Sequence, residues 1–416
     1  MPPRAKAPAV PRLTYLRIKN YRALCDVEFR DLTPLSVFIG PNGSGKSTVL
    51  DALAFLGMAL SGNLKEAFEG RDQFRGIQTR GSEGSIEFEV VVENIGDFGA
   101  LRYQISLTQS ANEHLIINEK LLVEENGEIH ELFKANPLLE GGGIKIESAW
   151  ARAHPEFKVS ENSESKTLEA ISIVSLSYAF AIDRRLSRFT RPLIDLINSY
   201  RYIHLTDNLK DFSDEGPRER LSANGKNISN VLYYLHLKHP DILEKITAQM
   251  RRWVPALADI VTEITSDERL LLRFKDAPFE KPLRGRYMSD GTMRLAALLT
   301  LLYEPDATGL LGIEEPENEL HPRLLPRLAE ELGKASENRQ LLVATHSPFL
   351  LDALAPEQVW ILHRGPDGYT QATRTADIPN VKELVEDGSP LGYLWTSNFF
   401  TVGDPLAPRT AAPDAR

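Results

Sequence analysis

Residues 35–51 read LSVFIGPNGSGKSTVLD, and no other segment of the chain indicates the fold as clearly. This stretch opens with a short, largely apolar run that contains β-branched Val37 and Ile39, which is typical of a buried strand. Residues 40–47 match G-x-x-x-x-G-K-[ST] at every fixed position, and apolar residues recur at helical spacing after Lys46. The stretch therefore predicts a strand, a glycine loop and a helix, which is the context that a phosphate-binding loop requires.

The glycine loop (residues 40–47) has the backbone chemistry of an anion site. Glycines let successive N–H groups point inward, and the N-terminus of the following helix adds partial positive charge. We expect Lys46 to bridge the β- and γ-phosphates of a nucleoside triphosphate and the Ser47 hydroxyl to bind Mg²⁺. A glycine-rich turn that matches by chance is the alternative, and it leaves the flanking strand and helix unexplained. The residues expected to hold the nucleotide are Asn42, Gly43, Ser44, Gly45, Lys46, Ser47 and Thr48.

Composition is that of an ordinary globular protein, with 42% hydrophobic and 25% charged residues among 416. The net charge of −10 argues against a protein that coats nucleic acid through bulk electrostatics, although a local basic patch is compatible with it. The single cysteine, Cys25, excludes an internal disulfide and a cysteine-based metal cage, so we expect a reducing compartment. The sequence has no long apolar run and no secretory signal, which predicts a cytoplasmic protein without a membrane contact.

The hydrophobic pattern divides the chain into segments. Alternation with period two from residue 85, and an Asn126-Gly127 turn, predict an antiparallel sheet. Residues 147–250 carry helical stripes, whereas residues 283–363 alternate strands and helices. The expected segments are a disordered tail (1–12), the first part of the nucleotide-binding core (13–84, with a loop over 68–84), an antiparallel β insert (85–146), a helical lid (147–255), the second part of the core (256–403) and a disordered tail (404–416).

This order of elements predicts an α/β fold. The expected fold is that of a P-loop NTPase with a mostly parallel sheet, an antiparallel β insert and a helical lid subdomain. No heptad run is long enough for a coiled coil.

Two predicted strands end in polar residues at the edge of the sheet where the glycine loop also lies. LLGIEE (residues 310–315) is an apolar strand that ends in Glu314 and Glu315, whose side chains should point differently. One can hold Mg²⁺ while the other activates the attacking water. A surface acidic turn is the alternative, but it does not explain why an otherwise apolar strand ends in this pair. His346 follows a second apolar strand and can hydrogen-bond a γ-phosphate oxygen or the water; a structural histidine is the alternative.

Other polar segments are less specific. In MSDGTMR (residues 288–294), Ser289 is a good N-cap and Gly291 leaves the backbone open to an anion, but any capped helix looks similar. An arginine cluster could contact phosphates, or it could be a solvated face paired with nearby acids, which we favour. The cluster consists of Arg184, Arg185, Arg188 and Arg191.

Together these motifs resemble the ATP-binding heads of the ABC superfamily, in the RecF/SMC/OLD branch that includes stand-alone bacterial AAA-type ATPases. The resemblance covers most of residues 13–363. The matching segments are GPNGSGKST (40–48, Walker A), MSDGTMR (288–294, signature), LLGIEEPENELHP (310–322, Walker B and D-loop), ATHSP (344–348, switch histidine), LRIKNYRAL (16–24, the start of the head) and LSANGKNISNVLYYL (221–235).

The resemblance implies a role for each candidate residue. Lys46 and Ser47 would bind phosphate and Mg²⁺, Glu314 would take the metal position, Glu315 would be the general base and His346 would sense the γ-phosphate. Ser289 and Gly291 would contact the nucleotide of a second subunit, so that ATP joins two heads. Glu314 departs from the family pattern, because many relatives carry the shorter Asp there. The glutamine of the Q-loop is Gln73 or Gln78, with Gln78 preferred, although either is compatible with a solvated loop residue.

The resemblance further implies a Mg²⁺-dependent ATPase whose ATP-dependent homodimerisation controls a DNA-directed process, in genome maintenance or phage defence, with a separate effector such as a nuclease. The lack of a coiled coil argues against an SMC-type tether. The segment after His346 has no acidic cluster that resembles a Toprim nuclease. The span from Lys46 to Ser289 is longer than that of ABC transporter ATPases. Two alternatives stay open: a nucleotide-gated scaffold with negligible turnover that does not touch DNA, and an ATPase that touches DNA through the arginine cluster.

Overall fold

The structure of the 416-residue chain is a computed structural model. It describes residues 10–404, with gaps at 62–63, 96–97, 110–114, 126–127, 138–143, 148–186, 207–208, 210–211, 214 and 268. The predicted Asn126-Gly127 turn, much of the predicted lid and nearly all of both predicted tails therefore lie outside the described residues. Arg12, which we assigned to the first tail, already belongs to the first strand.

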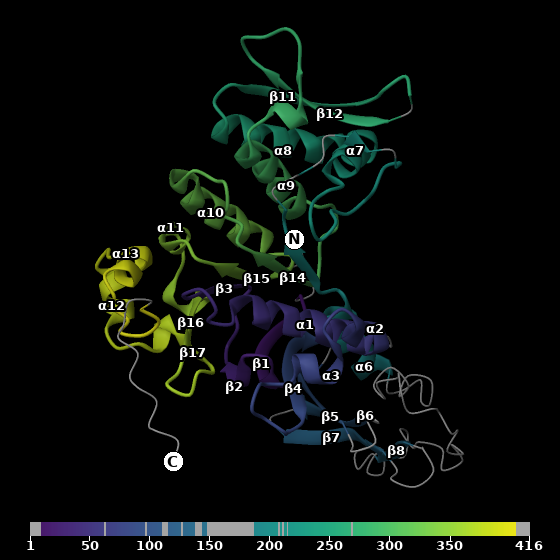
Figure 1. The fold of residues 1–416 in the computed structure, drawn as a ribbon, viewed down its shortest axis with the longest axis vertical. Coiled ribbons are helices and arrows are strands. Elements are labelled where there is room, and N and C mark those ends of the chain that lie inside the picture. Colours follow the sequence, from purple (N-terminus) through teal and green to yellow (C-terminus); the bar gives the residue numbers. More distant parts are fainter. Residues whose placement is uncertain are drawn as a thin grey trace, which may run out of the picture.

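The described chain is stacked in three tiers (Figure 1). A six-stranded sheet forms the middle tier, a seven-stranded antiparallel sheet lies below it, and the lid lies above it. Helix α1 (Lys46–Leu60) lies between the two large sheets and contributes eight buried apolar residues to the core that joins them. The nucleotide-binding segments belong to the middle tier.

The six-stranded sheet confirms the predicted parallel core. All neighbouring strands are parallel except β16 and the edge strand β17, which are antiparallel. The strand before the glycine loop, β3, has five buried residues, as expected for a strand covered on both faces. In spatial order the strands are β17 (Thr370–Arg374), β16 (Val359–Arg364), β3 (Leu35–Ile39), β15 (Gln340–Thr345), β14 (Leu310–Glu314) and β9 (Arg201–His204).

The antiparallel sheet is larger than the predicted insert, because the first two strands of the chain pair with it. β1 pairs with β4 through a register that runs from Arg12↔Glu93 to Lys19↔Glu87. In spatial order the strands are β2 (Leu24–Phe29), β1 (Arg12–Tyr21), β4 (Ile86–Ile95), β5 (Phe98–Gln109), β6 (Leu115–Glu125), β7 (Glu128–Pro137) and β8 (Ile144–Glu147).

The prediction of a loop over residues 68–84 is wrong in part. Helix α2 (Leu64–Glu69) extends into it and α3 (Gln73–Ile77) lies within it. Phe68, Phe74 and Ile77 are buried in the core with α1. Burial of these three side chains outweighs the helix-breaking composition of the segment, which is a tertiary effect that propensity cannot foresee.

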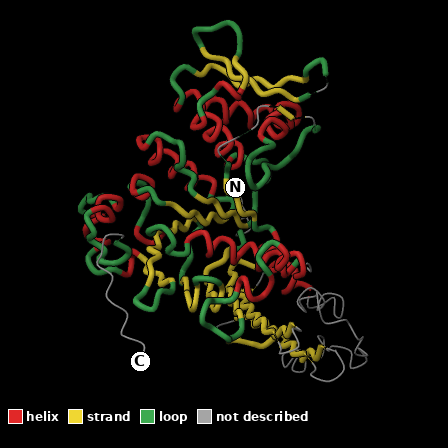
Figure 2. Tube along the Cα trace, in the orientation of Figure 1, coloured by secondary structure: helices red, strands yellow, loops and turns green. Residues whose placement is uncertain are grey.

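The lid is not purely helical, which corrects the expected division. A small antiparallel sheet packs on its helices, and Figure 2 shows these strands capping the helical layer. The strands of this small sheet over residues 257–284 belong to the lid, whereas the sequence analysis predicts them in the core. Strand β9 belongs to the core sheet, although its residues fall in the predicted lid. The elements of this part are β10 (Phe212–Ser213), α7 (Ile228–Lys238), α8 (Pro240–Trp253), β11 (Leu257–Ile264), β12 (Leu270–Asp276), β13 (Leu283–Arg284), the 3₁₀ turn η2 (Gly285–Tyr287) and α9 (Asp290–Leu302). Helix α6 (Ser187–Asn198), which the expected division places in the lid, instead packs against α1 and β4 in the lower part of the molecule.

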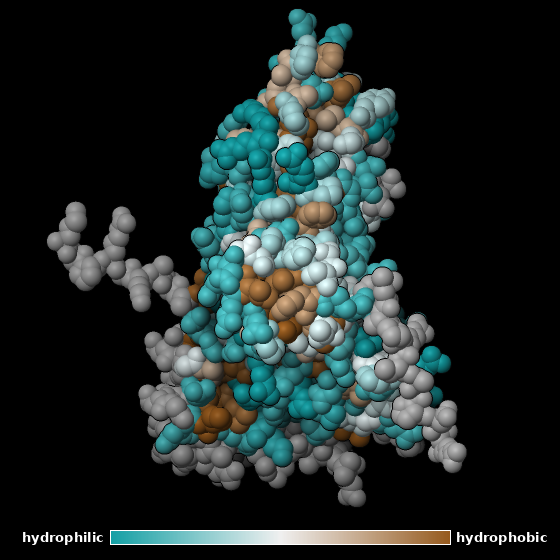
Figure 3. Space-filling model, turned by 90° about the vertical axis from the view of Figure 1, so that its left-hand side faces the viewer, coloured by the Kyte–Doolittle hydropathy of each residue, from teal (hydrophilic) through white to brown (hydrophobic). Residues whose placement is uncertain are grey.

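The remaining helices belong to the C-terminal part of the chain. They are η3 (Pro322–Leu324), α10 (Leu325–Ala335), α11 (Pro348–Leu351), η4 (Pro356–Gln358), η5 (Thr375–Asp377), α12 (Val381–Glu386) and α13 (Leu391–Thr396). Figure 3 shows apolar patches on the side of the molecule where α10 to α13 lie. Phe349 on α11, Tyr393 on α13 and Phe399 are exposed large hydrophobic residues of this region. Within the described parts of the chain, none of the helices has the length and apolar character that crossing a membrane requires.

Candidate nucleotide-binding site

The glycine loop folds between β3 and α1, as the sequence predicts. Gly43 and Gly45 have φ angles of 73° and 105°, in the left-handed region that favours glycine. A Cβ atom on Gly45 would also lie 2.5 Å from Oγ1 of Thr370. The loop leads directly into the first turn of α1, where helical N–H groups lack intrahelical partners and can bind an anion.

A pocket of about 280 Å³ lies over this loop. Of the residues predicted to hold nucleotide, Ser44 is buried instead of lining the pocket, and its carbonyl accepts a 2.8 Å hydrogen bond from Oγ1 of Thr370. The residues that line the pocket are Asn42, Gly43, Gly45, Lys46, Ser47, Thr48, Glu315, His346 and Arg364. The folded chain therefore brings the loop, one of the two carboxylates and the strand-end histidine into one pocket.

Lys46 is held inside its own loop. Its Nζ donates to the carbonyl oxygens of Gly40 at 2.8 Å and Pro41 at 3.1 Å, and the side chain is 5% exposed. Burial lowers the pKa of Lys46 to about 8, while the nearby carboxylates Glu315 and Glu317 oppose that change. A phosphate in the pocket would supply the negative charge that this buried ammonium group lacks.

Glu314 and Glu315 point in different directions, as the sequence predicts. Oε1 of Glu314 accepts a hydrogen bond from the Ser47 hydroxyl. Glu315 has a φ of 43°, a left-handed conformation that turns the chain at the end of β14 and is uncommon for a non-glycine residue. Its Oε1 lies 3.3 Å from Nε2 of His346, and its Oε2 accepts a 2.8 Å hydrogen bond from Asn318.

His346 is fixed by a residue that the sequence analysis did not single out. Oε1 of Glu317 accepts hydrogen bonds from Oγ1 of Thr345 at 2.6 Å and from the backbone N–H of His346 at 2.7 Å. Burial and the nearby charge of Lys46 lower the pKa of His346 below its ordinary value. These effects favour the neutral imidazole, and Glu317 holds the turn that presents it.

The serine and glycine of the signature segment lie outside this pocket. Ser289 caps α9: its side chain accepts a 3.3 Å hydrogen bond from the N–H of Thr292, and the residue is exposed. A Cβ atom on Gly291 would collide with the carbonyl oxygen of Glu319. This glycine is therefore required by close packing within the chain, whatever it contacts in addition.

The pocket includes neither Q-loop candidate. Gln73 opens α3 with a φ of 65°, and Gln78 donates a 2.8 Å hydrogen bond to the carbonyl of Gly84. The hydrogen bond of Gln78 is local. The structure does not bring either side chain to the glycine loop.

A hairpin that the sequence analysis missed forms one wall of the pocket. Arg364, at the end of β16, donates from Nε to the carbonyl of Gly43 at 2.6 Å and from a terminal nitrogen to Gly368 at 2.7 Å. On β17, Thr370 bonds Ser44 and packs against Gly45. A turn signal was present, because GPDG at residues 365–368 follows a predicted strand.

Strand β9 was also missed, and it faces Glu314 from the other side. Tyr202 donates a hydrogen bond to Oε2 of Glu314, and Nδ1 of His204 lies 3.1 Å from the same oxygen. The strand is four residues long and lies in a region with helical stripes, which hid it. The run of aromatic and β-branched residues from Tyr200 to His204 is the signal that would have found it.

The residues present fit a hard divalent cation. Ser47 and Glu314 place a hydroxyl and a carboxylate oxygen in contact, and oxygen ligands are those that Mg²⁺ prefers. Among the residues that the structure describes, no three His, Cys, Asp or Glu side chains are grouped as a metal site. Mg²⁺ at this position would therefore take its other ligands from nucleotide phosphates and water.

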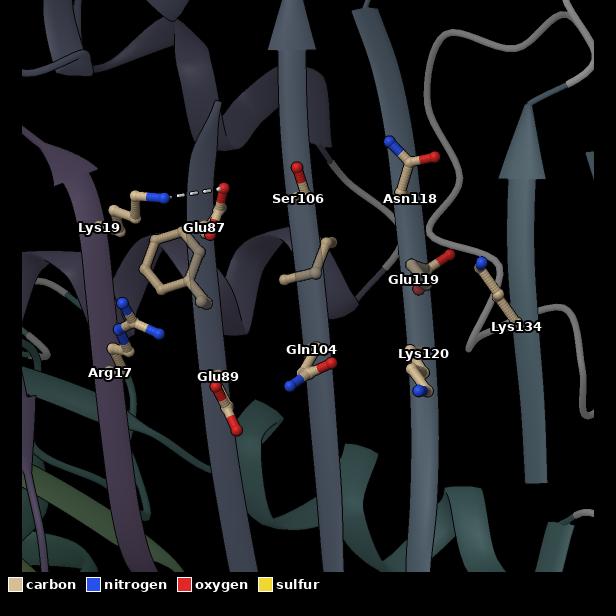
Figure 4. Close-up of a pocket in the computed structure, with 12 residues that line it drawn as sticks. Arg17, Lys19, Glu87, Glu89, Gln104, Ser106, Asn118, Glu119, Lys120 and Lys134 are labelled. Atoms are coloured by element: carbon tan, nitrogen blue, oxygen red, sulfur yellow. Dashed lines mark hydrogen bonds and ion pairs between the residues drawn. The ribbon is translucent and has the colours of Figure 1, made fainter. Parts of the chain in front are cut away.

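A second hollow, of about 320 Å³, lies on the outer face of the antiparallel sheet (Figure 4). Its charges are matched by neighbours: Lys19 with Glu87 at 3.5 Å, and Arg17 with Asp26 at 2.7 Å. Exposed ion pairs of this kind are typical of a solvated sheet face, so we assign no ligand to it.

The arginine cluster is described only at its end. Arg184 and Arg185 lie outside the described residues, and the side chain of Arg188 is not described. Arg191 is exposed, with Nε 3.7 Å from Asp195, which agrees with the solvated, paired interpretation for that residue.

The strand, glycine loop and helix, beside a parallel strand that ends in two carboxylates, define an ABC/SMC-like P-loop ATPase. The chain belongs to the family described as "AAA domain, putative AbiEii toxin, Type IV TA system", whose model matches residues 35–352.

Curated relatives are distant but extend over most of the chain. The OLD nuclease of Thermus scotoductus is 22% identical, and the match covers 90% of this chain and 67% of that protein. The Retron Ec83 probable ATPase of Escherichia coli is 21% identical, over 90% of this chain and 77% of its own length. The Retron Vc95 probable ATPase of Vibrio cholerae is 21% identical, over 85% and 73%.

Solved structures are similar at lower identity. A Smc head bound to the C-terminal winged-helix domain of ScpA has 15% identity and a TM-score of 0.48, with 87% of this chain and 97% of that chain covered. A Smc head with an extended coiled coil, bound to the C-terminal domain of ScpA derived from Pyrococcus furiosus, has 14% identity and a TM-score of 0.48 over 91% and 100%.

Proposed function

We propose that this protein binds ATP with Mg²⁺ and hydrolyses it at the pocket over the glycine loop. One observation carries the proposal: the Ser47–Glu314 contact lies beside a pocket that Lys46, Glu315 and His346 line together. These residues belong to or follow three neighbouring strands, β3, β14 and β15. Ligands in parallel α/β sheets bind beyond the carboxyl ends of the strands, where all five residues lie.

Each residue has a role that its surroundings support. Lys46 would leave its loop carbonyls for the β- and γ-phosphates, and Mg²⁺ held by Ser47 and Glu314 would neutralise charge on the phosphates. Glu315 would orient the attacking water and accept its proton, because its carboxylate faces the pocket beside His346. The neutral imidazole of His346 would donate a hydrogen bond to the γ-phosphate or to the water.

ATP would also join two copies of the chain. Ser289 lies at an exposed helix N-terminus and does not line the pocket of its own chain, so it is free to contact a nucleotide held by another copy. We propose that Ser289 and Gly291 do so. Hydrolysis would then separate the two copies, so the rate of ATP turnover would set the lifetime of the dimer.

The process that the dimer controls is proposed to be DNA-directed, in genome maintenance or phage defence, with a separate effector such as a nuclease. Relatives named OLD nuclease and retron ATPase support this proposal. Exposed Phe349, Tyr393 and Phe399 offer an apolar contact surface for a protein partner, and α11, which carries Phe349, follows His346 closely in the chain.

Steady-state ATP hydrolysis, measured with and without linear duplex DNA and together with mass in solution, tests the proposal. The wild-type protein should turn over ATP. Glu315→Gln should still bind ATP, lose turnover by about 100-fold or more and accumulate an ATP-bound dimer. If Glu315→Gln hydrolyses ATP at the wild-type rate, the assignment of Glu315 as the general base is wrong.

The dependence on DNA separates the remaining alternatives. Strong stimulation by DNA with a shift to dimer would identify a DNA-sensing clamp. Slow turnover that DNA does not change would assign DNA to the effector, and negligible turnover with tight binding would favour the nucleotide-gated scaffold.

A further inference from the structure

The carboxylate of Glu314 is approached from two sides. From the glycine loop, Ser47 donates to Oε1. From the edge strand β9, Tyr202 donates to Oε2 and Nδ1 of His204 lies 3.1 Å from that oxygen. The pairing of β9 with β14 places His204 directly opposite Glu314. Three residues from two other segments of the chain therefore meet at the carboxyl group of Glu314.

Alternation along β9 explains why these side chains meet. Tyr200, Tyr202 and His204 are spaced by two residues, so they occupy the same face of the sheet. Tyr200 identifies that face, because its hydroxyl donates to the carbonyl of Leu50 in α1 at 3.1 Å. A Cβ atom on Gly312 of β14 would collide with the Tyr200 hydroxyl, so a glycine opens room for the first member of the row. The last member, His204, lies opposite Glu314, whose other oxygen contacts Ser47 in the first turn of α1.

This arrangement accounts for a glutamate at the metal position. The side chain of Glu314 is one methylene longer than that of aspartate, and its two oxygens contact groups from both flanks. The His204 side chain is 54% exposed, so its ring can turn about its own torsions at little cost in packing. Tyr202 holds the shared oxygen in place.

We propose that Nδ1 of His204 is a third protein ligand of the cation, beside Ser47 and Glu314, and that it biases the site toward first-row transition ions over Mg²⁺. The inference rests on the proposed function, since it concerns the cation of that pocket. Mg²⁺ favours an all-oxygen shell, whereas an imidazole nitrogen favours ions such as Mn²⁺ and, more strongly, Co²⁺. Tyr202 is a positioning residue, because it acts through Glu314.

Electron spin-echo spectroscopy of bound Mn²⁺ tests this ligand directly. The complex is formed by the full-length protein with Mn²⁺ and the β,γ-methylene analogue of ATP, which places no nitrogen in the phosphate chain. The wild-type spectrum should contain modulation from one directly bound ¹⁴N nucleus. His204→Ala should lose this modulation and bind Mn²⁺ about tenfold more weakly, with less than a twofold change for Mg²⁺.

His236→Ala is the matched control, because His236 lies on α7 with its ring stacked near Tyr233 and distant from the sheet edge. It should retain the ¹⁴N signal. Bound Mn²⁺ without ¹⁴N modulation in the wild type, or modulation that persists in His204→Ala, would overturn the inference and leave the proposed function intact. Failure of the wild type to bind Mn²⁺ with the analogue would contradict the proposed function itself.

Discussion

Two helices of this protein begin with a glycine-containing motif, and their N-termini differ in what surrounds them. At α1, Lys46 is 5% exposed inside a pocket built from β14, β15 and β16 as well as its own loop. At α9, Ser289 is exposed and its hydroxyl is occupied only with the cap of its own helix. The same local device, a helix N-terminus, is thus enclosed in one place and open in the other.

A helix N-terminus therefore becomes a binding site only through the residues that pack around it. The α1 terminus has its lysine, carboxylate and histidine within one chain, so a single copy can bind nucleotide. The α9 terminus has a dipole and a serine but no enclosing wall from this pocket, so it needs a second surface before it can hold an anion.

The largest effect is expected where the enclosed terminus loses its charge. Lys46→Ala should abolish ATP binding, with at least a 100-fold loss of affinity by calorimetry, because the lysine is the buried cation of the pocket. Lys382→Ala, an exposed lysine paired with Glu357 at 2.9 Å, is the control and should bind normally. Retained affinity in Lys46→Ala would contradict the assignment of the glycine loop.

The open terminus should respond in the opposite way. Ser289→Arg, placed in the Glu315→Gln background, should bind ATP within about twofold of the parent but lose the ATP-dependent dimer in light scattering, because a bulky side chain blocks a surface that only a second copy uses. Ser61→Arg, at the C-terminal end of α1, controls for the added charge. A dimer that survives Ser289→Arg would mean that α9 lies outside the interface.

A smaller effect is expected at the wall of the enclosed site. Arg364→Ala should weaken ATP binding by about three- to tenfold, since the residue both lines the pocket and holds Gly43 of the loop. Arg374→Ala is the matched control in the same hairpin, because Arg374 bonds Asp31 and Glu357 away from the pocket. Equal losses in both variants would indicate a general weakening of the hairpin.

The smallest expected effect is the uptake of protons by Lys46 when ATP binds. The pKa of Lys46 is about 8 in the free protein, and phosphate oxygens favour its charged form, so the pKa should rise on binding. ATP binding near pH 8.5 should therefore take up a fraction of one proton, and binding at pH 6.5, where Lys46 is already protonated, should take up none through this group. Calorimetry in two buffers of different ionisation enthalpy measures the uptake, and Lys382→Ala, the exposed-lysine control, should leave it unchanged. Equal uptake at both pH values would contradict the mechanism.

Sequence patterns predicted which elements carry Lys46, Glu315 and His346, because these residues lie next to strong local signals. Each of these segments combines an apolar pattern with a glycine or polar residue that marks where the element ends. The segments are the strand before the glycine loop, the strand that ends in Glu314 and Glu315, and the strand before His346. Glu317 was missed because only the turn after β14 brings it to the N–H of His346.

Residues on short or distant elements could not be placed in this way. His204 belongs to a four-residue strand that is recognisable mainly by its pairing with β14. Arg364 meets Gly43 across 321 residues of sequence, a contact that no local pattern encodes. Residues 64–69 and 73–77 form short helices because Phe68, Phe74 and Ile77 are buried in the core, which is a property of the whole fold.

The position of β3 in the middle of its sheet has a consequence for synthesis. Its two neighbours are β15 and β16, and Ser44 and Thr370, which join the loop to the hairpin, are 326 residues apart. A growing chain therefore exposes the glycine loop long before either neighbouring strand has been made. Non-local strand pairing of this kind is slow, and unpaired apolar strands are prone to aggregate. The nascent chain should acquire its affinity for ATP in a single late step, once residues up to about 370 have left the ribosome.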